Sequence, residues 1–144
     1  MSTVPVVDAI VLAGGEGRRL GGVDKAAVVV GGRSMLEHVL DAVADARRSV
    51  VVGPPSLETH GAARVQEDPP LGGPAAGLAA GLAHLGAAEV DPADLVVVLA
   101  CDLPLAASVV PELLTALARD GGSDGVVLLD GEGRRQPLLA CYRG

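Results

Sequence analysis

A short glycine-rich stretch near the N-terminus, LAGGEGRRLGGVDK (Leu12–Lys25), gathers the residue types that bind phosphate groups. The adjacent glycines Gly14–Gly15 let the backbone approach a ligand closely and point its amide groups at it. Arg18 and Arg19 add charge-assisted donors, and Lys25, the only lysine among 11 basic residues, adds a compact point charge. The stretch therefore predicts a phosphate site, with a surface turn carrying solvated charges as the alternative.

This stretch fits neither of the two best-known phosphate-binding patterns. The dinucleotide pattern G-x-G-x-x-G/A, started at Gly15, has Leu20 in its last position. The Walker pattern, started at Gly17, has Val23 after Gly22, where a lysine is required. A helix begins at once in both motifs, whereas here AAVVVGG precedes the next expected helix. We therefore expect a longer loop that surrounds its ligand differently, and a dinucleotide-dependent oxidoreductase is a distant alternative.

A carboxylate is the second candidate for chemistry. Asp102 directly follows the apolar run DLVVVLAC (Asp94–Cys101), which is typical of a buried strand, and Pro104 comes two residues later. A carboxylate at a strand end can hold Mg²⁺ between phosphate oxygens. The alternative is an N-cap or turn aspartate. Cys101, just before it, is expected to be a small buried hydrophobic residue and not a nucleophile.

Strand-like and helix-like segments alternate along the chain. The expected strands are Val6–Ala13, Ser49–Gly53, Ala63–Asp68, Asp94–Cys101, Gly125–Asp130 and Gln136–Arg143. The expected helices are Ser34–Ala46, Pro74–Leu85 and Ser108–Asp120, and Ser34 and Glu37 form a capping box at the first of them. This alternation predicts a single α/β domain over residues 1–144, with a three-layer αβα arrangement and a mostly parallel, Rossmann-like sheet. Ligands of such folds bind beyond the carboxyl ends of the strands.

The composition argues against several classes of function. The chain is 49% hydrophobic with no Phe or Trp, so its core is aliphatic, and a bound base would be held mainly by backbone groups. A net charge of −7 argues against nucleic-acid and anionic-membrane binding. No apolar run reaches the ~20 residues of a membrane span, and the N-terminus lacks the features of a signal peptide. Cys101 and Cys141 read as buried thiols of a cytoplasmic protein, and the histidines match no metal motif; these are His38, His60 and His84.

Four segments together resemble a known family, the nucleotidyltransferases of molybdenum cofactor biosynthesis. LAGGEGRRLGGVDKA is similar to the signature L-A-G-G-x-x-x-R-[ML]-G-x-D-K, and EDPPLGGPAAGLAAGL is similar to an acidic residue followed by G-P-x-A-G. LACDLPL resembles a strand ending in C-D-x-P, and QPLLACYR resembles a strand that begins with Q/H-P. The segments follow the family's order between residues 6 and 143. The form L-A-G-G, in place of L-A-A-G, favours the guanylyl branch over the cytidylyl branch.

The resemblance implies a nucleotide-diphospho-sugar transferase-like fold and a reaction. In this reaction the terminal phosphate of molybdopterin attacks the α-phosphate of GTP, and pyrophosphate leaves. Positioning and charge neutralisation would do most of the catalytic work. Arg19 and Lys25 would hold the triphosphate and stabilise the leaving pyrophosphate. Asp24 either orients Lys25 or is a turn residue, and Arg18 either joins the site or is a solvated loop charge.

The other site residues follow from the same resemblance. The backbone of four residues would line the nucleotide, namely Leu12, Ala13, Gly14 and Gly15. Asp102 would hold Mg²⁺, and Asp68 matches the family's acidic residue at the nucleotide. Gly73, Pro74 and Gly77 would shape the loop and helix start around the base or ribose, with ordinary helix capping as the alternative. A helix N-terminus aimed at the ligand would also favour an anion.

The chain departs from the family in its length. Members usually continue with another helix, a further strand and an N-x-[ND]-T-P-like segment, whereas this sequence stops at Gly144. It is therefore expected to be a C-terminally shortened member, a fragment, or a chain that takes these elements from a partner or by self-association. Two hypotheses stay beside Mg²⁺-dependent guanylyl transfer to molybdopterin. One is a related enzyme that uses CTP or another phosphorylated acceptor, and the other is a truncated, non-catalytic nucleotide-binding protein.

Overall fold

The computed structural model describes residues 5–13, 19–20, 23–70, 72–86, 91, 94–103 and 105–144. For residues 19–20 and 23–25 the description covers the backbone alone. Three of the predicted site residues, Gly14, Gly15 and Arg18, lie outside the described residues.

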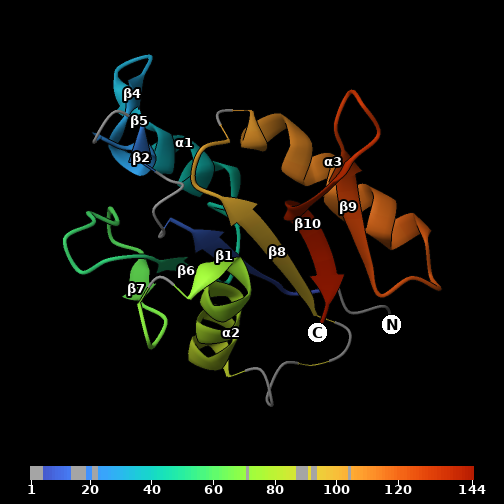
Figure 1. The fold of residues 1–144 in the computed structure, drawn as a ribbon. Coiled ribbons are helices and arrows are strands. Elements are labelled where there is room, and N and C mark those ends of the chain that lie inside the picture. Colours follow the sequence, from blue (N-terminus) through green and yellow to red (C-terminus); the bar gives the residue numbers. More distant parts are fainter. Residues whose placement is uncertain are drawn as a thin grey trace.

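The described part is built around a six-stranded sheet in the order β7-β6-β1-β8-β10-β9 (Figure 1). The strands are β1 (Val7–Leu12), β6 (Arg48–Val52), β7 (Ala63–Val65), β8 (Leu95–Ala100), β9 (Gly125–Leu129) and β10 (Arg135–Arg143). The first four strands of the order are mutually parallel, and β10 runs antiparallel to both β8 and β9. The predicted mostly parallel sheet is therefore confirmed, and its one reversed strand joins β9 through the charged turn GEGRR.

Helices cover both faces of the sheet, which confirms the three-layer arrangement (Figure 1). On one face, Leu36 and Val39 of α1 (Met35–Ala42) share a core with Leu113 and Leu117 of α3 (Ala106–Arg119). On the other face, α2 (Gly73–Leu85) packs its Leu85 against a second core. All six residues of β8 are buried because the strand has a core on each side. This explains why its sequence is continuously apolar.

The capping box predicted for the first helix is present in α1. The Glu37 amide donates to Oγ of Ser34 at 3.2 Å, and the Ser34 amide donates to Oε2 of Glu37 at 2.7 Å. The helix is shorter than predicted, because it ends at Ala42 and not at Ala46. The amide of Arg47 donates to the carbonyl of Val7 at 2.7 Å, so the chain must turn into β6 before another helical turn can form.

The described residues between β1 and α1 form short elements and no α-helix. They are β2 (Arg19–Leu20), β3 (Val23–Asp24), the 3₁₀ turn η2 (Lys25–Ala27), β4 (Val29–Val30) and β5 (Arg33–Ser34). The strands pair as two small antiparallel ladders, β2 with β3 and β4 with β5. These described residues agree with the expectation of a longer loop, and the way in which it surrounds a ligand stays a prediction. Among the described residues, no helix has both the length and the apolar character needed to cross a membrane.

Candidate active site

Hydrogen bonds just beyond the strands align the carboxyl ends of β1, β6 and β8. The Ala13 amide donates to the carbonyl of Val52 at 2.8 Å, and the Cys101 amide donates to the carbonyl of Leu12 at 3.0 Å. Both Leu12 and Ala13 have buried side chains, so any contact with a ligand has to use their remaining backbone groups. The same bonds place the residue after Cys101, Asp102, beside the start of the glycine-rich stretch.

Asp102 is partly exposed in the turn that follows β8. Cys101 is fully buried, as expected of a small core residue, and burial raises the pKa of the Cys141 thiol to about 11. Within the described residues, no three carboxylate, histidine or cysteine side chains gather in a way that could hold a metal. A single protein carboxylate can still be enough to bind Mg²⁺. This ion commonly takes one or two protein carboxylates and completes its coordination shell with phosphate oxygens and water.

The first turn of α2 reaches the same edge of the sheet. A Cβ atom added to Gly77 would lie 3.4 Å from Cδ2 of Leu12 and 3.5 Å from Cγ1 of Val52, so this glycine lets the helix lie close to both strand ends. Gly73 has a φ of +88°, a conformation that favours glycine. Both Gly73 and Pro74 are exposed at the helix start. The backbone amides of this turn are therefore presented at the edge where a ligand is expected.

The acidic pair before α2 divides into one buried and one exposed residue. Glu67 is 8% exposed, whereas Asp68, the residue named from the sequence, is exposed. A Cβ atom added to Gly72 would lie 3.7 Å from Cγ of Glu67, so the buried carboxyl group belongs to the entry of α2. Sequence reasoning missed Glu67. Val65 and Glu67 are two residues apart, so their side chains point to the same side of an extended chain. This spacing could have identified Glu67 as buried.

The backbone of the glycine-rich stretch brings its two predicted triphosphate residues near each other. Arg19 of β2 lies opposite Asp24 of β3 in the antiparallel ladder, and Lys25 follows Asp24 at the start of η2. The backbone positions of Arg19 and Lys25 are therefore close together, although five residues separate them in the sequence.

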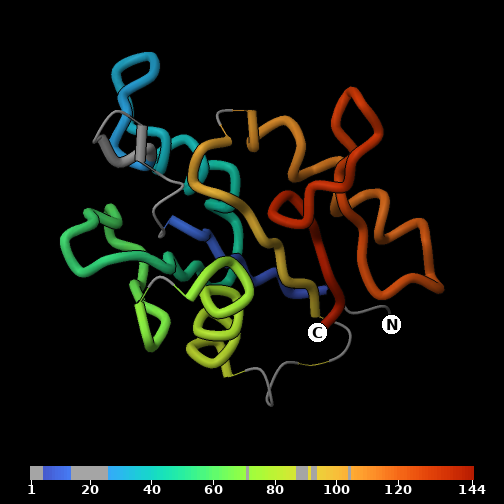
Figure 2. Tube along the Cα trace, in the orientation of Figure 1, coloured from blue at the N-terminus to red at the C-terminus, as the bar shows by residue number. Residues whose placement is uncertain are grey.

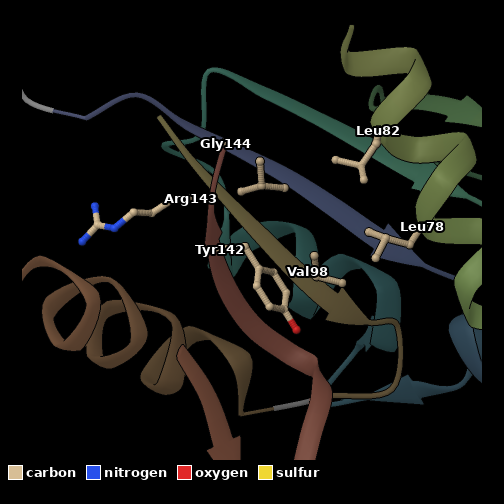
Figure 3. A pocket seen from close by; sticks show the side chains of 7 residues that line it. Leu78, Leu82, Val98, Tyr142, Arg143 and Gly144 are labelled. Carbon is tan, nitrogen blue, oxygen red and sulfur yellow. The ribbon is translucent and has the colours of Figure 1, made fainter. Parts of the chain in front are cut away.

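A cavity of about 320 Å³ lies elsewhere, between α2 and the sheet (Figure 3). It lies over Val96 and Val98 in the middle of β8 and over the end of β10. Its walls are almost entirely apolar, and the guanidinium of Arg143 turns away from it to the carbonyl groups of Leu117 and Asp120 (Figure 3). The lining residues are Leu78, Leu82, Val96, Val98, Tyr142, Arg143 and Gly144. Such a surface does not suit a triphosphate.

Known proteins resemble the chain along almost its whole length. The family model described as the MobA-like NTP transferase domain matches residues 9–144. A molybdenum cofactor guanylyltransferase of Shewanella sp. (strain MR-4) is 31% identical over 142 residues, which is 95% of this chain and 68% of that protein. A protein of the same name from Bradyrhizobium sp. (strain ORS 278) is also 31% identical, over 98% of this chain and 68% of its own.

Solved structures give the same likeness. The molybdopterin-guanine dinucleotide biosynthesis protein A of Archaeoglobus fulgidus superposes with a TM-score of 0.65 at 28% identity, over 94% of this chain and 67% of that one. The 2-C-methyl-D-erythritol 4-phosphate cytidylyltransferase of Thermus thermophilus superposes with a TM-score of 0.53 at 26% identity, over 97% of this chain and 71% of that one. The fold is thus that of nucleotidyltransferases, as the sequence resemblance implied.

Proposed function

Because the chain belongs to the MobA-like NTP transferase family and is a nucleotidyltransferase, we propose that it transfers GMP from GTP to the terminal phosphate of molybdopterin. The observation that carries this proposal is the convergence of Asp102 and the first turn of α2 on the carboxyl end of β1. Guanine is preferred over cytosine as the base because the curated relatives are named guanylyltransferases.

The reaction needs an anionic oxygen of the acceptor to attack the α-phosphorus of GTP. A new P–O bond forms, the bond to the β-phosphate breaks, and pyrophosphate leaves with the bonding electrons. In the proposal, Arg19 and Lys25 neutralise the charge that grows on the leaving pyrophosphate. The amides at the start of α2 and in the glycine-rich stretch hold the nucleotide in line.

Asp102 would hold Mg²⁺ at the phosphates, where the ion would supply charge neutralisation and polarise the α-phosphate. Asp68, exposed just before α2, would contact the nucleotide. Gly73, Pro74 and Gly77 would shape the pocket for the base or ribose. Neither cysteine forms a disulfide and both are buried, which suits a reducing compartment, so the proposal places the enzyme in the cytoplasm.

The sole lysine makes a direct test available. An amine-reactive reagent can modify Lys25 and the N-terminal amine alone, and peptide mass spectrometry separates the two products. We expect GTP with Mg²⁺ to slow the modification of Lys25, whereas CTP, ATP and NAD⁺ do not. Incubation with molybdopterin should then yield a guanine dinucleotide and pyrophosphate.

Other outcomes of this panel identify the alternatives. Protection by CTP alone would make the chain a cytidylyltransferase. Protection by GTP without pyrophosphate release would favour a non-catalytic nucleotide-binding protein. If no nucleotide slows the modification of Lys25, the proposal is wrong.

A further inference from the structure

We propose that Ala26 is a positioning residue that fixes Lys25 for the reaction. This inference rests on the proposed function, in which Lys25 holds the triphosphate. Ala26 is 1% exposed and belongs to the same core cluster as Leu36 and Val39 of α1. The next residue, Ala27, is exposed. Since Lys25, Ala26 and Ala27 form one 3₁₀ turn, burial of the middle residue sets the backbone position of the lysine before it.

The chain after this turn is fastened to α1 and cannot easily shift. The Met35 amide donates to the carbonyl of Val28 at 2.8 Å. A ring nitrogen of His38 lies 2.6 Å from the carbonyl of Val30. Figure 2 shows this segment as the blue loop that rises from the start of α1 and returns to it.

Two further contacts hold the base of this loop. Arg33 of β5 forms an ion pair with Asp41, one helical turn beyond His38. Ser34 and Glu37 close the capping box at the helix start. The segment from residue 28 to residue 34 is thus tied to α1 along much of the helix.

These contacts decide how the molecule would respond to a larger side chain at Ala26. The core around Leu36 and Val39 is closed, and the downstream segment is held by several bonds. We therefore expect added volume to displace the turn outward and to move Lys25 away from the triphosphate.

The experiment compares Ala26→Leu with Ala27→Leu, which adds the same atoms at the exposed neighbour. The modification rate of Lys25 is measured with and without GTP and Mg²⁺, and kcat and KM are measured beside it. We expect Ala26→Leu to change the modification rate without GTP, to lose protection by GTP, and to lower kcat/KM roughly 10- to 100-fold. Ala27→Leu should stay near the wild type. If Ala26→Leu does not fold, the smaller Ala26→Val replaces it.

A double variant separates a positioning role from general damage to the core. If Ala26 acts through Lys25, then Lys25→Ala with Ala26→Leu should be no less active than Lys25→Ala alone. Losses that multiply, or an Ala26 variant with a lower melting temperature but normal GTP protection, would overturn the inference. If the wild type shows no GTP protection, the proposed function fails. The modification rates of the two leucine variants without GTP still decide whether Ala26 positions Lys25.

Discussion

The guanidinium of Arg47 donates two hydrogen bonds to the carboxylate of Asp8, at 3.0 and 2.6 Å. Arg48 donates to the same carboxylate at 2.8 Å, and Asp8 is only 1% exposed. This cluster lies at the amino end of β1, opposite the candidate active site. It joins the starts of β1 and β6, and Asp94 extends it to the start of β8 through a contact of 3.5 Å with Arg47.

The Asp8 cluster predicts a loss of stability in acid. Burial acts to raise the pKa of Asp8, but the hydrogen bonds and charges of Arg47 and Arg48 outweigh it, so the pKa lies below its ordinary value of 3.8. The stabilisation is therefore complete above about pH 4 and is lost as the pH falls through the lowered pKa. Asp8→Asn should cost roughly 3 kcal/mol in urea unfolding near neutral pH and much less in acid. The exposed Asp45→Asn should change neither value, and an equal cost at both pH values would contradict the prediction.

Replacing Asp102 should separate chemistry from folding. Asp102→Asn keeps the size of the side chain but removes the charge proposed to hold Mg²⁺. We expect kcat to fall roughly 100-fold or more, with a higher Mg²⁺ requirement and with the fold retained. The control is Asp124→Asn, an exposed aspartate at the amino end of β9. A Mg²⁺ titration curve identical to that of the wild type would remove Asp102 from the proposed metal site.

The acidic pair before α2 should give two different phenotypes. Glu67→Gln alters a buried carboxyl group, so we expect it to lower the free energy of unfolding by about 1–3 kcal/mol. Asp68→Asn alters an exposed group, so it should raise the Kd for GTP while leaving stability near that of the wild type. Urea unfolding and nucleotide titration of both variants make the comparison. The opposite pattern would show that Glu67 is the residue that meets the nucleotide.

Because α2 packs closely on β1, one methyl group added at Gly81 should lower the stability of the protein. A Cβ atom added to Gly81 would lie 2.8 Å from Cγ2 of Ile10, whose side chain is fully buried. Gly81→Ala should therefore destabilise the protein by about 1–3 kcal/mol although alanine is the better helix former. Gly121→Ala is the control, because no atom lies within 4 Å of its added Cβ. Equal melting temperatures for the two variants would mean that α2 shifts without cost.

Much of this architecture could be predicted from the sequence because its signals are local. The apolar run Asp94–Cys101 predicted β8, and the spacing of Ser34 and Glu37 predicted the capping box that starts α1. The end of α1 could not be predicted, because the bond from Arg47 to Val7 joins segments far apart in the chain. The two-residue ladders of β2 to β5 are too short to leave a periodic pattern.

The candidate site could be predicted only in part, because some of its features depend on contacts between segments far apart in the chain. Asp102 could be named because it ends a clear strand, and Gly77 because it belongs to a motif. The choice between Glu67 and Asp68 depends on which of two adjacent carboxyl groups faces the interior, and this is a matter of tertiary packing. The burial of Ala26 depends on α1 and left no signal in its own neighbourhood.

The cavity between α2 and the sheet contains the only aromatic side chain of the protein, Tyr142. Its ring leaves no room for a side chain at Gly125 of β9, and its hydroxyl group lies 3.4 Å from the carbonyl of Pro137. With no tryptophan in the sequence, ultraviolet emission from the protein comes from this one ring. Fluorescence would therefore report the separation of β9, β10 and α2 during unfolding, and it would stay silent while a nucleotide occupies the opposite edge of the sheet.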